Sequence, residues 1–216
     1  MITGISGNGN QIGAAPINLT KGEKINLSKE APGLKRVLVG LGWDVNDYSS
    51  GDDYDLDASA FLVDKFGKTA PENFVFYGSG YQTPEGMKCD PAQSVIHTGD
   101  NRTGAGDGDD EQIIIDLDKV PAHIEKIAIT VTIHEADRRR QNFGNVENSY
   151  IRLVDQETDR EILRFELCEE FSVETAIVAA ELYKYKGDWK FNAVGAGFAN
   201  GLIGLCNKFG LEAEYR

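Results

Sequence analysis

The chain has 216 residues, of which 41 % are hydrophobic, and a formal net charge of −13 with a pI near 4.7. This length suits one large domain, and the apolar content is enough for a core. The acidity argues against a nucleic-acid partner and against direct attraction to anionic lipid, and it leaves cations and basic proteins as partners.

Residues 1–16 are rich in glycine and asparagine, and we expect a flexible lead-in to a single domain spanning residues 17–216. They lack the basic and apolar regions of a signal peptide. No apolar run approaches the ~20 residues of a membrane span, so no transmembrane segment is expected. The three cysteines, Cys89, Cys168 and Cys206, show no zinc-binding spacing and no CxxC, which favours reduced thiols in the cytosol.

The first predicted elements are short strands. Residues 17–21 and 25–29 repeat an alternating pattern, and we expect them to pair as a hairpin. A strand over residues 34–43 follows and ends at Asp44. The segment from Asp44 to Asp57 then contains six aspartates and no basic residue, with a loop at its centre.

Residues 56–64 form the next predicted strand, and two aspartates lie at its start. Because strand side chains alternate, Asp55 and Asp57 point to the same side, in a row that continues with Ser59, Phe61 and Val63. A bare carboxylate is expensive at the end of a core-facing row.

The stretch from Asp100 to Glu111 must be a loop, because it holds five acids, one base and three glycines in twelve positions. Two like charges about 4 Å apart repel by about 4 kcal/mol at the effective dielectric near a protein surface. If these acids fold inward they need a cation, and we expect a hard metal ion, most suitably calcium.

The rest of the chain predicts more strands and one helix. Along residues 124–135 one face carries Ile127, Ile129, Val131 and Ile133, and Glu135 is next in that row. A helix over residues 198–209 ends at Gly210. Further strands are expected over residues 73–77, 112–117, 148–155, 161–167, 176–185 and 189–194. Many short strands separated by turns predict an all-β antiparallel sandwich with a short C-terminal helix.

The acidic clusters lie at strand ends, which can converge at one edge of a sandwich. Calcium takes six to eight oxygen ligands, and these acids supply enough for one ion and a second. Magnesium keeps more of its waters, and zinc prefers clustered cysteine and histidine. The alternative is that the acidic loops are simply solvated. An EF-hand starting at Asp100 fails, because Arg102, Gly104 and Ala105 do not fit its third, fifth and sixth positions.

Several long, ordered motifs resemble the TerD family of tellurium-resistance and general stress proteins. The first are Gly40-Leu41-Gly42-Trp43-Asp44, Asp53-Tyr54-Asp55-Leu56-Asp57-Ala58-Ser59-Ala60-Phe61, His97-Thr98-Gly99-Asp100-Asn101-Arg102-Thr103-Gly104 and Gly106-Asp107-Gly108-Asp109-Asp110-Glu111. Later ones are Thr132-Ile133-His134-Glu135-Ala136, Gln141-Asn142-Phe143-Gly144 and Trp189-Lys190-Phe191. The resemblance spans residues 17–210. The lead-in and the connection over residues 81–92 look longer than in the family.

The resemblance implies a β-sandwich that binds calcium through its acidic loops in a bacterial cytoplasm, with peripheral association with the inner membrane as a further option. It implies a link to stress tolerance and to other tellurite-resistance proteins as partners. The positions that match the acidic motifs, and are therefore the expected metal ligands, are Asp44, Asp55, Asp57, Asp100, Asn101, Asp107, Asp109, Asp110, Glu111 and Glu135.

Two other classes of function compete with a non-enzymatic calcium-binding adaptor. A hydrolase would need a nucleophile, but Ser94, His97 and Asp100 lie within seven residues and no oxyanion loop accompanies them. A calcium-dependent module that binds a membrane surface or a small ligand would use the same acids. For membrane insertion it has only Tyr48 and Tyr54. We therefore expect a binding or scaffold protein and no enzyme.

Overall fold

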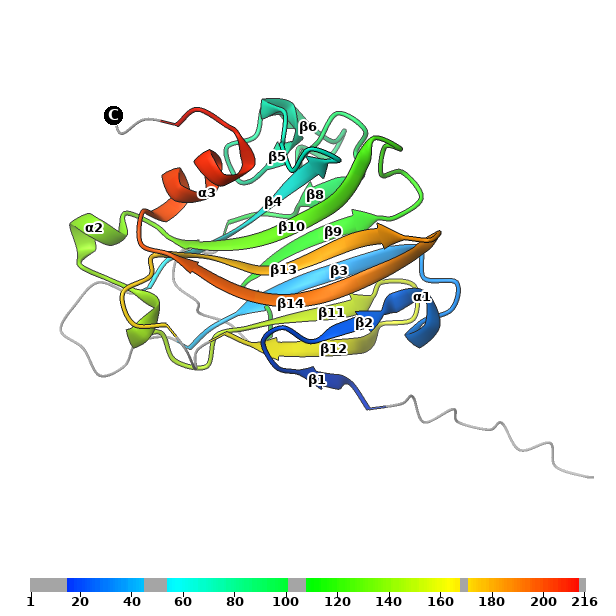
Figure 1. Ribbon diagram of the computed structural model, residues 1–216, viewed down its shortest axis with the longest axis horizontal. Coiled ribbons are helices and arrows are strands. Elements are labelled where there is room, and N and C mark those ends of the chain that lie inside the picture. Colours follow the sequence, from blue (N-terminus) through cyan, green and yellow to red (C-terminus); the bar gives the residue numbers. More distant parts are fainter. Residues whose placement is uncertain (1–14, 45–53, 101–107, 168–170, 214–216) are drawn as a thin grey trace, which may run out of the picture.

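The computed structural model describes residues 15–44, 54–100, 108–167 and 171–213. Two β-sheets pack face to face, with short helices at their margins, and this confirms the predicted sandwich (Figure 1). Within the described residues, sheet A has the strand order β1 (Ile17–Leu19), β12 (Arg160–Glu166), β11 (Tyr150–Asp155), β3 (Arg36–Gly42), β9 (Glu111–Asp116), β8 (Val95–His97), β7 (Lys88–Cys89) and β6 (Tyr81–Gln82). Sheet B has the order β2 (Lys24–Asn26), β14 (Asp188–Phe198), β13 (Ala176–Tyr185), β10 (Ile124–Ile133), β4 (Leu56–Asp64) and β5 (Phe74–Val75).

The predicted hairpin near the N-terminus is wrong. Strand β1 instead runs parallel to β12 in sheet A, and β2 runs antiparallel to β14 in sheet B. The second copy of the repeat continues into a short helix, α1 (Leu27–Glu30). The chain crosses between the sheets at Gly22, whose φ is 85°. Leu19, in the first copy, and Leu27, in the second copy, are both buried in the core between the sheets. The two copies therefore pack into the same core from different sheets.

The main core lies between the two sheets. Strand β10 contributes the predicted row of Ile127, Ile129, Val131 and Ile133, and β3 faces it with alternate residues such as Val39. Full burial of one such side chain contributes about 1.5–3 kcal/mol. This repeated burial holds the strand ends of both sheets in place.

A second, smaller core covers the outer face of sheet B. Helix α3 (Gly201–Phe209) lies beside sheet B (Figure 1). Its residues Leu205, Cys206 and Phe209 pack against Phe61 and its neighbours on β4. The helix ends at Gly210 in the left-handed region, as predicted. The predicted row of Asp57, Ser59, Phe61 and Val63 therefore faces α3 and not the core between the sheets.

Strand β10 is shorter than predicted, and this moves Glu135. The strand ends at Ile133, and Glu135 has a φ of 49° before a short helix, α2 (Ala136–Arg139). This left-handed residue breaks the alternation, so Glu135 does not continue the row of isoleucines. Two 3-10 turns, η1 (Pro71–Asn73) and η2 (Phe143–Asn145), complete the described elements.

Candidate metal centre

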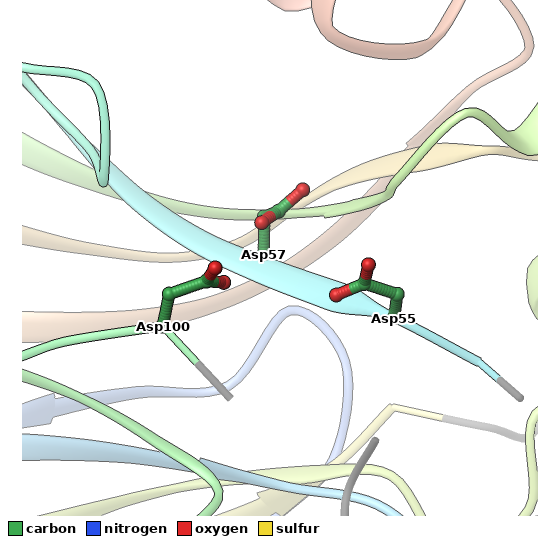
Figure 2. Close-up of side chains that lie close together, drawn as sticks. All are labelled: Asp55, Asp57 and Asp100. Carbon is green, nitrogen blue, oxygen red and sulfur yellow. The ribbon is translucent and has the colours of Figure 1, made fainter. Parts of the chain in front are cut away.

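Three carboxylates converge at one end of the sandwich. Asp55, Asp57 and Asp100 each place a carboxylate oxygen within 4.8 Å of the others (Figure 2). Asp55 and Asp57 lie at the start of β4 in sheet B, whereas Asp100 follows β8 of sheet A. Asp55 and Asp57 are only 2 % and 8 % exposed, and Asp100 is exposed. Tertiary packing thus brings together acids that are 43 to 45 positions apart in the chain.

The spacing of these oxygens fits calcium. Calcium–oxygen bonds are about 2.3–2.6 Å, so ligand atoms on opposite sides of one ion are about 4.6–5.2 Å apart. Three oxygens that all lie within 4.8 Å of one another fit on one such coordination sphere. Hard carboxylate donors also match the preference of calcium for oxygen.

In the absence of a metal ion, the acidic side chains of this cluster repel one another. Burial, followed by the negative charges of Glu111, Asp55 and Asp100, raises the pKa of Asp57 to about 8, although Arg139 opposes this rise. Burial and the same acidic group also raise the pKa of the Tyr77 hydroxyl. Both shifts show that a further negative charge is disfavoured here, whereas a cation would relieve the repulsion.

Two basic side chains from the α2 region face this cluster. Arg139 approaches Asp55 with 3.4 Å between Nη2 and Oδ2, and His134 approaches Asp57 with 3.6 Å between Nδ1 and Oδ2. The backbone N–H of His134 also donates to the carbonyl of Asp55, which attaches the end of β10 to the start of β4. The protein therefore compensates only part of the cluster's charge.

Glu111 lies between the sheets, beneath the cluster. It is 1 % exposed, and its Oε2 accepts a hydrogen bond from the backbone N–H of Ala58 at 2.6 Å. The same oxygen is 3.6 Å from Nε2 of His97, which is equally buried. Glu111 therefore holds the start of β4 in place through this hydrogen bond, and its negative charge contributes to the raised pKa of Asp57.

Asp109 is separated from the cluster by sheet A. Its carboxylate accepts from Nε and Nη2 of Arg152 at 2.7 and 3.0 Å, and the Tyr150 hydroxyl lies 3.3 Å away. It lies directly over Gly40, where a Cβ atom would overlap it. Arg152 thus already balances the charge of Asp109.

Asp44 and Asp110 form a looser acidic pair near the end of β3. Oδ2 of Asp110 accepts from the backbone N–H of Trp43 at 3.0 Å, and Asp44 accepts from the side chain of Asn148. The pKa of Asp110 is raised mainly by burial, with contributions from Asp109 and Asp44. Among the residues that the structure describes, Asp44 and Asp110 are the candidate ligands for the second calcium ion that the sequence analysis predicts.

The remaining predicted ligands are not in the cluster. Glu135 forms an ion pair with Arg138, whose hydrogen bond is the main reason that the pKa of Glu135 is lowered. Its side chain is 43 % exposed. Asn101 and Asp107 lie outside the described residues.

A cleft of about 470 Å³ opens beside the cluster and shares Asp57 with it. Its walls come from the end of β10, from α2 and from the start of α3, and include Thr132, His134 and Arg138. Thr132 and His134 belong to a motif that resembles the family, but none of these three residues is among the predicted site residues. The run Arg138-Arg139-Arg140, close to an acidic motif in a strongly acidic chain, is the signal that could have found this wall.

Comparison with known proteins identifies relatives over most of the chain. The family model for the TerD domain matches residues 16–209. General stress protein 16U of Bacillus subtilis is 50 % identical over 91 % of this chain and 98 % of its own length. Tellurium resistance protein TerD of Serratia marcescens is 48 % identical over 92 % of this chain and 99 % of its own length. A solved structure from Streptomyces coelicolor A3(2), described as a homologue of telluride resistance protein (TerD), is 26 % identical with a TM-score of 0.60. That match covers 79 % of this chain and 94 % of the solved chain.

Proposed function

Since the chain belongs to the TerD domain family, we propose that it is a calcium-binding protein of the tellurium-resistance and general stress response that acts by binding, not by catalysis. The observation that carries this proposal is the group of Asp55, Asp57 and Asp100, which gathers three carboxylates from two sheets. Calcium at this point would join β4 of sheet B to the segment that follows β8 of sheet A. The ion would therefore stiffen one end of the sandwich.

The number of ions is part of the proposal. We assign the first ion to Asp55, Asp57 and Asp100, and a second to the region of Asp44 and Asp110. The pKa of Asp110 is raised mainly by burial, and the nearby charges of Asp109 and Asp44 add to the rise, so a cation there would stabilise the ionised carboxylate. Among the described residues, only the first group brings three carboxylates within 4.8 Å.

The arrangement of potential nucleophiles supports a binding role. The Ser94 hydroxyl donates to Oδ2 of Asp90 at 3.1 Å, and His97 faces Glu111. Both Ser94 and His97 are almost fully buried, at 0 % and 1 % exposed. Ser94 is therefore neither activated by His97 nor open to a substrate.

We further propose a bacterial cytoplasmic location, where the free, buried thiols of Cys89 and Cys206 would remain reduced, and partners among other tellurite-resistance proteins. In the described part of the chain, no helix has the length and apolar character needed to cross a membrane. Calcium-dependent capture of such partners would test the scaffold role.

Calorimetric titration of the metal-free protein with calcium, and in parallel with magnesium, tests the proposal. We expect calcium to bind with a dissociation constant below millimolar and more tightly than magnesium. Asp57→Asn and Asp100→Asn should each weaken this binding, while Asp118→Asn, on an exposed turn, serves as the matched control. The proposal fails if calcium does not bind below millimolar, or if the control weakens binding as much as the cluster variants do.

A further inference from the structure

The cleft beside the cluster has the size of a small-molecule site. Ligand pockets commonly enclose about 300–1,000 Å³, and this one has a volume of about 470 Å³. Its lining residues come from the end of β10, from α2 and from the start of α3. Its lining is mixed, with Tyr77 and Leu202 beside Asp57, Thr132 and Arg138.

Two largely buried polar side chains, Thr132 and Asp57, line the cleft. Thr132 and Asp57 are register partners on β10 and β4, so they lie side by side on the outer face of sheet B. They are only 6 % and 8 % exposed. The Asp57 carboxylate lies 3.6 Å from Nδ1 of His134, whereas the Thr132 hydroxyl makes no hydrogen bond to another described residue. Buried polar groups normally have such partners, so the Thr132 hydroxyl is available to a ligand.

The start of α3 presents hydrogen-bond donors to the same space. Gly201, Leu202 and Ile203 form its first turn and line the cleft, and the preceding Asn200 makes no side-chain cap. The first N–H groups of a helix lack partners within the helix, and the helix dipole favours negative charge there. Together these groups suit the oxygens of a phosphate.

The α2 side of the cleft carries charges of both signs. Arg138 and His134 line the cleft together with Asp137 and with Glu135, which is the ion-pair partner of Arg138. The attraction for an anion would therefore come mainly from a cation bound to Asp57 at the base of the cleft. Three carboxylates provide at most six oxygens, while calcium accepts six to eight, so coordination positions remain open for another ligand. A tetrahedral phosphate can offer one oxygen to the ion and others to the helix amides and Arg138, which a planar carboxylate does less well.

We propose that this cleft binds a phosphate monoester, whose oxygens complete the coordination of the cation at Asp57 and accept hydrogen bonds from Thr132, Arg138 and the first turn of α3. The inference rests on the proposed calcium site. The same phosphate monoester group occurs in small soluble metabolites and as the headgroup of phosphatidic acid in a membrane, so either could be the source of the ligand.

Calorimetry on the full chain tests the inference with glycerol 2-phosphate as the probe, in calcium and in a chelator. We expect binding only in calcium. Thr132→Val and Arg138→Gln should each weaken it about tenfold, because each removes one hydrogen bond to a charged group, and should leave calcium affinity unchanged. Arg140→Gln is the matched control, because Arg140 belongs to the same run but does not line the cleft.

A parallel sedimentation assay uses phosphatidylcholine vesicles with and without phosphatidic acid. Binding of the soluble probe identifies a metabolite site, whereas calcium-dependent binding only to phosphatidic acid vesicles identifies the lipid. If calcium binds but neither probe does, the inference is overturned and the proposed function stands. If calcium itself does not bind, both are overturned. Equal binding by wild type, Thr132→Val and Arg138→Gln, or undiminished binding in chelator, also overturns it.

Discussion

The carboxylate of Glu111 on β9 accepts a hydrogen bond from the backbone N–H of Ala58 on β4, across the gap between the two sheets, at 2.6 Å. Both residues are almost fully buried. The contact fixes the start of β4, and hence Asp55 and Asp57, relative to sheet A. The geometry of the candidate metal centre therefore depends on a residue directly beneath it.

Replacing Glu111 with alanine should destabilise the protein. The change leaves the buried N–H of Ala58 without its acceptor, which costs about 1–3 kcal/mol. Glu111→Gln keeps an acceptor oxygen and removes a charge, so we expect a smaller loss in the metal-free protein. Urea unfolding in chelator measures both, and equal losses for the two variants would contradict the role of the hydrogen bond.

The metal-free protein should lose stability as the pH rises towards the pKa of Asp57. In the folded state that pKa is raised to about 8, well above its value in the unfolded chain. Between about pH 4 and pH 8 the folded state therefore holds a proton that the unfolded state has released, so this group's contribution to stability falls as the pH rises. We expect Asp57→Asn to remove this component of the pH dependence, as measured by thermal melts in chelator. An unchanged profile would show that Asp57 is not the group responsible.

Calcium should stabilise the wild-type protein by mass action. At a free concentration of ~100 times its dissociation constant, an ion that binds only the folded state adds about 2.7 kcal/mol. Asp57→Asn and Asp100→Asn should lose most of this gain, whereas Asp118→Asn should retain it. Melting curves with and without calcium provide the measurement, and coincident curves for the wild type would rule out a structural ion.

Asp109 should contribute to stability mainly through Arg152. Removal of either partner leaves a partly buried charge without its bidentate contact, and we expect a loss of about 1–2 kcal/mol for Asp109→Ala or Arg152→Ala. The double variant should lose less than the sum. Calcium affinity at the cluster should change far less in Asp109→Ala than in Asp57→Asn. A comparable drop in both would place Asp109 among the ligands.

Gly40 should tolerate no side chain, because Asp109 occupies the space over it. Gly40→Ala pushes the carboxylate away from Arg152, and such overpacking costs about 1–3 kcal/mol. Gly80→Ala is the control, since a Cβ atom there meets open space. Chemical unfolding should show a clear loss for the first variant only.

Local sequence patterns were enough to predict most of the strands and the end of α3. Alternation correctly places Ile127, Ile129, Val131 and Ile133 on one face, because side-chain direction within a strand depends only on neighbouring residues. For the same reason Asp55 and Asp57 were identified as a pair of carboxylates at the start of β4. Composition alone led to the prediction of a cation site, because so many acids close together repel one another.

The tertiary structure decided which acids meet. Alternation would place Asp109 and Glu111 on the same face, yet β9 begins only at Glu111, so Asp109 turns outward to Arg152 while Glu111 lies between the sheets. Glu135 leaves its row because its backbone is left-handed. Strand partners, strand ends and the approach of Asp100 to Asp57 depend on contacts between residues distant in the chain. Local periodicity carries no information about such contacts, and the cleft beside Asp57 exists only through them.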